Sequence, residues 1–196
     1  YWGFKEEPLA RDEMKKLFAY MKECGKKTVL EVVCYDEKNS LAGAYVAAEC
    51  GCDYLMGTVF FDSVNEFCKA HNLKYLPFVG KLSERPSVLD GDIDDMIAEA
   101  KEYLEKGVYG IDLLGYRYNG DASKLIERFV NEVDAPVCVA GSVNSYERLD
   151  EIKKISPWSF TIGGAFFEKV FGEDFAEQIN TVCDYMAENK EAALVK

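Results

Sequence analysis

Two segments of the sequence end an apolar run in small residues and then enter a helical pattern. They lie at residues 135–144 and 159–167, and their small residues are Gly141, Ser142, Gly163 and Gly164. Backbone N–H groups at such positions can face an anion, and the dipole of a following helix adds to the attraction. The alternative is a pair of tight turns in which glycine supplies only a positive φ. Because the two segments follow each other, we predict that they bind one phosphate group.

Two carboxylates interrupt apolar runs that read as buried strands. Glu31 lies in the run 29–34, and Asp112 lies in the run 111–114. A carboxylate in a buried strand costs free energy unless it is paired or functional. If both side chains point into one interior, they can act as acid and base, with pKa values set by burial and by each other. The alternative is a buried ion pair with a lysine or an arginine.

Three cations follow strand patterns closely. Lys81 and Arg117 come just after two expected strands, and Lys5 has the same place if residues 1–4 end a strand. A lysine there can stabilise an enolate or form a Schiff base, and an arginine can bind a carboxylate or phosphate through two N–H groups. Each alone is also consistent with a solvated loop cation. We predict a catalytic role for Lys81 and substrate binding for Arg117 and Lys5.

The elements that must position these residues alternate along the whole chain. Strands are expected at 28–34, 53–59, 74–79, 108–114 and in the two small-residue segments, with a further strand ending near 1–4. Helices are expected at 8–24, 40–50, 62–72, 92–106, 121–133 and 174–189, the helix after residue 144 starting with an Asn144–Glu147 capping box. Residues 80–91 are expected to form a long loop.

Strict alternation of strands and helices predicts an α/β fold with a parallel sheet. An open, doubly wound sheet and a closed (β/α) barrel both satisfy it. The two small-residue loops at the last two strands, and the lack of a G-x-G-x-x-G motif, favour a barrel of the TIM type over residues 1–196 as a single domain. Such barrels usually need about 200–250 residues. We therefore expect either a first strand upstream of Tyr1 or an incomplete barrel.

The composition indicates which classes of binding partner to expect and in which cellular compartment the protein works. The formal net charge of −12 disfavours nucleic acids and anionic membranes as partners. The seven cysteines include no C-x-x-C pair, which favours reduced thiols and a cytoplasmic protein. A single histidine, His71, makes a zinc site or a histidine-dependent triad improbable. No cofactor is predicted, and the use of a divalent metal is left open. The expected partner is a small phosphorylated metabolite, and a homodimer is one expected assembly.

Two motifs resemble those of a known superfamily. The segments Pro136-Val-Cys-Val-Ala-Gly-Ser142 and Phe160-Thr-Ile-Gly-Gly-Ala165 resemble the last two strands of phosphate-binding (ribulose-phosphate-binding) TIM barrels. The layout is also similar to the glycerol-3-phosphate-responsive antiterminator branch. The resemblance implies a phosphate site and leaves the reaction open. The D-x-K-x-x-D motif of the orotidine-phosphate decarboxylases and the metal-binding histidines of ribulose-phosphate 3-epimerase are absent, which argues against both activities.

Three hypotheses of function follow. The first is an enzyme that acts on a small phosphorylated sugar or sugar acid by abstracting a proton next to a carbonyl. It would be an isomerase, an epimerase or an aldolase-type lyase. The second is a regulatory barrel that senses a phosphometabolite without chemistry, as the antiterminator resemblance implies. A degenerate barrel that serves as a scaffold is a third reading.

Overall fold

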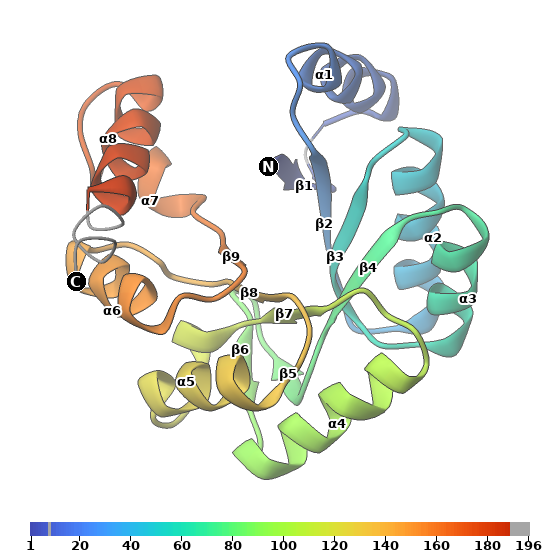
Figure 1. Cartoon of the computed structure of the whole chain (residues 1–196). Helices are drawn as coiled ribbons and strands as arrows, with labels where there is room; N and C mark the ends of the chain where they lie inside the picture. The colour runs from blue at the N-terminus through green and yellow to red at the C-terminus, as the bar shows by residue number, and fades with distance from the viewer. Residues whose placement is uncertain (8, 189–196) are drawn as a thin grey trace.

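Seven parallel strands curve around one interior in the computed structural model, which describes residues 1–7 and 9–188 (Figure 1). They are β1 (Trp2–Lys5), β2 (Thr28–Cys34), β3 (Tyr54–Val59), β4 (Lys74–Phe78), β7 (Ile111–Leu113), β8 (Val137–Val139) and β9 (Ser159–Phe160). The helices on the outside are α1 (Arg11–Glu23), α2 (Glu37–Glu49), α3 (Asp62–Ala70), α4 (Ile93–Glu105), α5 (Ala122–Glu132), α6 (Tyr146–Ile155), α7 (Gly164–Phe167) and α8 (Phe175–Ala187). A 3₁₀ turn, η1 (Gly115–Arg117), follows β7.

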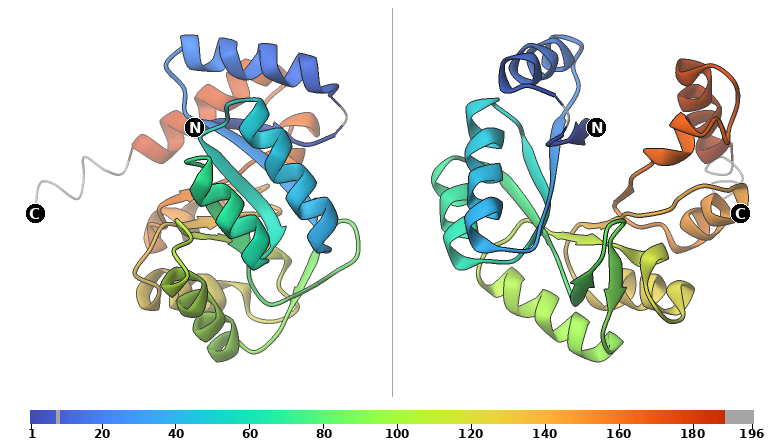
Figure 2. Two further views of the ribbon diagram at one scale, coloured as in Figure 1. Left: turned by 90° about the vertical axis from the view of Figure 1, so that its right-hand side faces the viewer. Right: turned by 180° about the vertical axis from the view of Figure 1, so that it is seen from behind.

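The strands keep the order of the chain, as in a (β/α) barrel. One parallel sheet has the order β1-β2-β3-β4, and the other has the order β7-β8-β9. They meet between β4 and β7, where the Tyr109 N–H donates to the Tyr75 carbonyl at 2.9 Å. Within the described residues β1 and β9 do not pair, so the ring of strands is open there (Figure 2). Parallel strands with outer helices confirm the expected α/β barrel architecture, and a strand upstream of Tyr1 stays a prediction.

The main core lies between the strands and the outer helices. Alternate side chains of each strand face outward, such as Leu30 and Val32 of β2, and pack against buried helix residues such as Ala44 and Ala47. Burying one large apolar side chain of this kind stabilises the fold by about 1.5–3 kcal/mol. Because side chains alternate along a strand, the residues between those of the outer core face the interior of the barrel.

Most helix ends lie where the sequence places them. Asp92, Asp121 and Asp174 each cap the helix that follows, their carboxylates accepting backbone N–H groups in the first turn. The helix expected at 40–50 begins earlier, because Asp36 accepts from the Asn39 N–H at 3.0 Å and starts α2. Pro8 and Asn189, expected at helix ends, lie outside the described residues. No helix in the described part of the chain is long and apolar enough to cross a bilayer.

Two local expectations are wrong. The loop expected at 80–91 contains an antiparallel hairpin of β5 (Lys81–Ser83) and β6 (Val88–Asp90), which a fully buried Leu89 anchors. Three-residue strands are too short to show a period of two in the sequence. The expected capping box of Asn144 is replaced by Ser145, whose hydroxyl accepts from the Arg148 N–H at 3.4 Å.

Gly110 tests how tightly the strands near Asp112 pack. A Cβ atom at Gly110 would overlap the carbonyl oxygen of Pro136, so Gly110→Ala must push the chain before β7 away from the start of β8. We expect a loss of about 1–3 kcal/mol in the free energy of unfolding, measured by urea denaturation. Gly163→Ala is the matched control, because a Cβ there meets nothing within 4 Å and φ is −132°. Equal stability of the two variants would contradict this packing.

Candidate functional site

Strand alternation points three charged side chains toward the inner side of the strands, and the first of them, Lys5, is exposed there. In β1, Phe4 faces outward and stacks on Phe18 of α1 with a centroid distance of 4.4 Å. Lys5 therefore faces the other side, and in the parallel ladder Lys5 is the register partner of Glu31. Register partners in a sheet share a face, so Lys5 and Glu31 point the same way. Leu30 faces the outer core, which agrees with an inward Glu31.

Asp112 reaches the same interior from the opposite sheet. Its neighbours Ile111 and Leu113 belong to the outer core, whereas its register partner Cys138 belongs to a separate, smaller cluster of buried strand side chains. Asp112 is only 1% exposed, and within the described residues neither of its carboxylate oxygens has a hydrogen-bond partner. The structure thus brings Glu31 and Asp112 together, as the acid–base hypothesis requires.

Burial and nearby charges shift the pKa values of both carboxyl groups. Burial raises the pKa of Asp112 well above its ordinary value, the charge of Glu31 raises it further, and Lys5 partly offsets both. Burial also raises the pKa of Glu31, while Lys5 and Arg117 lower it and Glu6 raises it. Asp112 is therefore the better proton donor, and Glu31 has more nearby cations to favour its ionised form. Two carboxyl groups with such different surroundings are suited to opposite roles in proton transfer.

Gly57 provides the space for Glu31, and the sequence reading did not single it out. A Cβ atom at Gly57 would lie 2.9 Å from Glu31 Cγ, and its φ of +92° is one that side chains rarely adopt. The pairing of β3 shifts register on either side of it, between Met56 and Val59. A lone glycine inside a strand pattern is a known sign of a bulge or of a close approach. That signal was available in the run 53–59.

The first small-residue loop follows β8 and adopts a left-handed turn. Gly141 has φ +79° and Ser142 has φ +57°. The side chain of Arg117 crosses the loop, since a Cβ at Gly141 would lie 2.9 Å from Arg117 Cδ. A guanidinium thus lies directly against one predicted phosphate loop.

The second small-residue loop follows β9 beside the first. The Thr161 N–H donates to the Val139 carbonyl at 3.0 Å, so the two strands end at the same edge of the sheet. Both glycines of this loop, Gly163 and Gly164, are exposed. In residues 1–7 and 9–188, the amide N–H groups of Gly141, Ser142, Gly163 and Gly164 donate to no protein acceptor. These four N–H groups remain available to an anion.

The predicted cations divide into two groups. Arg117 lies between the β8 loop and Glu31, its Nη1 3.5 Å from the Ser87 carbonyl, and within the described residues it forms no ion pair. Lys5 acts on both carboxylates. Lys81 lies exposed on the β5–β6 hairpin, in register with Asp90. The charges of Lys5 and Arg117 act on the carboxylates, whereas that of Lys81 is not among those that shift the pKa of either one.

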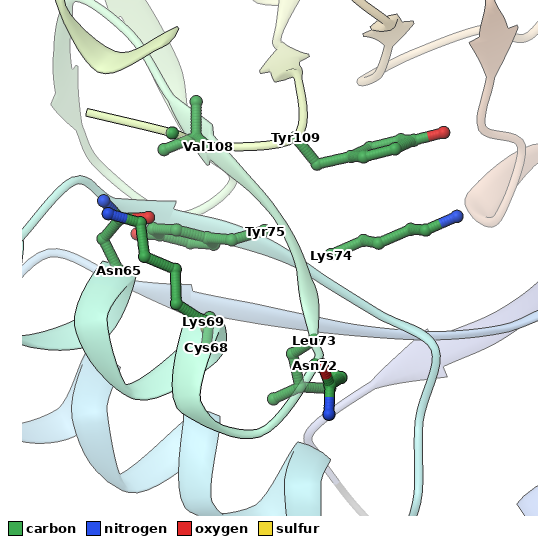
Figure 3. Close-up of a pocket in the computed structure, with 10 residues that line it drawn as sticks. Asn65, Cys68, Lys69, Asn72, Leu73, Lys74, Tyr75, Val108 and Tyr109 are labelled. Atoms are coloured by element: carbon green, nitrogen blue, oxygen red, sulfur yellow. The ribbon is translucent and has the colours of Figure 1, made fainter. Parts of the chain in front are cut away.

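The groove drawn in Figure 3 belongs to the other end of the barrel. It has a volume of about 510 Å³ and includes Lys74, the first residue of β4, and Tyr109, which precedes β7. The Lys74 ammonium lies 4.7 Å from the centre of the Tyr109 ring and 5.1 Å from that of Tyr54. Active sites of (β/α) barrels lie at the carboxyl ends of the strands. The groove is therefore separate from the interior carboxylates and the small-residue loops.

Within the described residues, no group of three or more histidine, cysteine, aspartate or glutamate side chains is arranged to hold a metal ion. All seven cysteines are free, and four of them are buried.

Comparisons with known proteins show the fold. No protein-family model matches the chain, and no curated protein sequence does. Among solved structures, thiamine phosphate pyrophosphorylase from Pyrococcus furiosus is 16% identical with a TM-score of 0.64, over 95% of this chain and 82% of that one. Orotidine 5'-phosphate decarboxylase from Pyrococcus horikoshii OT3 is 12% identical with a TM-score of 0.63, over 90% and 81%. A native KDPGal structure is 11% identical with a TM-score of 0.60, over 98% and 95%. The chain therefore has an α/β fold of the TIM-barrel type.

Asp112 should make the free energy of unfolding depend on pH. Since its pKa is higher in the folded protein than in the unfolded chain, the wild type loses stability as pH rises from about 4 toward the folded pKa. Asp112→Asn removes this loss. We expect the stability of the variant relative to the wild type to increase between pH 4 and pH 8.

Urea unfolding at pH 4, 6 and 8 measures this difference. The matched control is Asp95→Asn on the exposed side of α4, which changes one charge without touching the interior. Parallel pH profiles for Asp112→Asn and the wild type would show that Asp112 is not held in its protonated form.

Proposed function

We propose that this protein is a cytoplasmic enzyme that acts on a small phosphorylated sugar or sugar acid. The reaction moves a proton next to a carbonyl group, as in an isomerase, an epimerase or an aldolase-type lyase. The observation that carries the proposal is the pair of half-buried Glu31 and buried Asp112 beside Arg117, whose side chain also lies against Gly141. Acid–base groups and a candidate phosphate loop thus share one cation.

In this proposal the substrate phosphate binds to the two small-residue loops. The amides of Gly141 and Ser142 contribute from one loop, and those of Gly163 and Gly164 contribute from the other. Their N–H groups have no protein acceptor in the described structure, so binding an anion breaks no internal bond. Arg117 adds a positive charge at the side of the loop that faces the carboxylates. The phosphate then directs the rest of the substrate toward Glu31 and Asp112.

The chemistry assigned to the interior residues is proton transfer. Ionised Glu31 removes the proton from the carbon next to the carbonyl, and protonated Asp112 donates a hydrogen bond to the oxygen that becomes negative. Lys5 and Arg117 stabilise that oxyanion by their charge. We give Lys5 the role that the sequence suggested for Lys81, because Lys5 faces the carboxylates. Lys81 stays a candidate only through movement of its hairpin.

The alternative function is a regulatory barrel of the antiterminator-like branch that senses a phosphometabolite. The matched motifs support it as well, since they describe phosphate binding and not a reaction. It requires the phosphate loops but no proton transfer by Glu31 and Asp112. The net charge of −12 disfavours an RNA-binding face.

Phosphate binding is tested first. Isothermal titration with inorganic phosphate and with three- to six-carbon sugar phosphates should show binding by the wild type. Arg117→Met should weaken it by about tenfold or more, the effect of losing one charge-assisted contact. Arg11→Met, on the exposed ion pair with Glu49, is the matched control and should bind as the wild type does. Unchanged affinity in Arg117→Met would contradict its place at the phosphate.

Proton transfer is tested by solvent exchange. The protein is incubated in D₂O with each sugar phosphate that binds, and deuterium at the carbon next to the carbonyl is followed by NMR. Glu31→Gln and Asp112→Asn should each reduce exchange by about 100-fold or more while retaining phosphate affinity. Exchange that needs Lys81 and survives Lys5→Met would return the oxyanion role to Lys81. Phosphate binding without exchange for any compound would favour the sensor.

A further inference from the structure

The loop after β8 holds a serine in a backbone conformation that favours glycine. Ser142 has φ +57°, in the left-handed region, where a side chain is strained. Such a conformation persists only where the surroundings determine it. The residues that determine it here come from α6 and from η1.

Arg148, in the first turn of α6, donates hydrogen bonds to two acceptors of the loop. Its Nη1 donates to the Ser142 carbonyl and, at 2.7 Å, to Asn144 Oδ1. Within the described residues Arg148 forms no ion pair, so its guanidinium is committed to these neutral loop acceptors. Because a peptide unit is planar, fixing the Ser142 carbonyl also fixes the orientation of that unit beside the amides of Gly141 and Ser142.

Tyr116 contacts Arg148 through both its ring and its hydroxyl group. The guanidinium carbon of Arg148 lies 4.8 Å from the centre of the Tyr116 ring, and the Tyr116 hydroxyl donates to the Arg148 carbonyl at 3.2 Å. The next residue of η1, Arg117, lies across Gly141 on the same loop. Two residues of the 3₁₀ turn therefore act on the loop. Tyr116 packs against Arg148, which binds the loop, and Arg117 contacts the loop itself.

We propose that Arg148, supported by Tyr116, is a positioning residue that holds the Gly141–Ser142 turn in the conformation that binds phosphate. It acts through the Ser142 carbonyl and does not touch the ligand. The inference rests on the proposed phosphate site, and it adds a residue of α6 that neither the motif nor the comparisons assign. It also links the phosphate loop to the turn that carries Arg117.

The test combines loss of the arginine with relief of the strain. Arg148→Met should weaken the binding of inorganic phosphate by tenfold or more, and Arg148→Lys should weaken it less. Adding Ser142→Gly to Arg148→Met should restore the affinity to within threefold of Ser142→Gly alone, because glycine adopts this φ without a clamp. Arg11→Met controls for the loss of one arginine. An arginine that acted only by its charge would not be rescued by glycine, and that result would overturn the inference.

A second measurement does not depend on phosphate. Hydrogen–deuterium exchange of the segment 140–146 in the ligand-free protein should be faster in Arg148→Met, with the rest of α6 protected as in the wild type. Unchanged exchange in this segment would overturn the clamp even if phosphate binds. If the wild type binds no phosphate compound while exchange responds to Arg148, the proposed function fails and the clamp on the loop stands as a structural finding.

Discussion

The alternation of side chains along short parallel strands is the constraint on which this molecule depends. Each strand offers one set of side chains to the outer helices and the other set to the barrel interior. The outward set is apolar, as Leu30, Ile111 and Leu113 show, and its burial supplies the hydrophobic stabilisation. The inward set is free to include charge, so Lys5, Glu31 and Asp112 lie in one interior. The outer core thus offsets the cost of desolvating Asp112.

The end of the barrel at the carboxyl ends of the strands, here called the mouth, differs in local charge from the protein as a whole. The protein has a formal charge of −12, yet Lys5 and Arg117 lie next to the interior carboxylates without forming an ion pair in the described structure. Local cations outweigh distant negative charge because screening limits the surface field to about 10 Å. An anionic group can therefore be attracted to this mouth although most of the surface repels it. Lys5 acts on both carboxylates, whereas Arg117 lowers the pKa of Glu31 and is not among the charges that shift the pKa of Asp112.

The β5–β6 hairpin ties the early strands to the late ones. Arg85 donates to the Val33 carbonyl of β2 at 2.6 Å, and Ser87 hydrogen-bonds to the Tyr35 hydroxyl at 2.6 Å. On its other side, the Asn119 N–H donates to the Leu89 carbonyl at 2.8 Å, just after η1. The strand that carries Glu31 and the turn that carries Arg117 are thus joined through one hairpin. This connection supports a fixed spacing between the acid–base pair and the β8 loop.

The sequence by itself determined the alternation of strands and helices, and with it the α/β class. The two small-residue loops at the last two strands then favoured a barrel over an open sheet. Apolar periodicity and carboxylate caps are local signals, and Asp92 and Asp121 carry them plainly. The direction of Glu31 was not determined, because its strand is apolar on both faces and the sequence shows no phase. The choice between Lys5 and Lys81 also required the tertiary structure, since it depends on strand register and on a hairpin too short to leave a periodic pattern. Only packing across the chain revealed that Gly57 makes room for Glu31 and that Arg148 holds Ser142, because each contact joins residues of different elements.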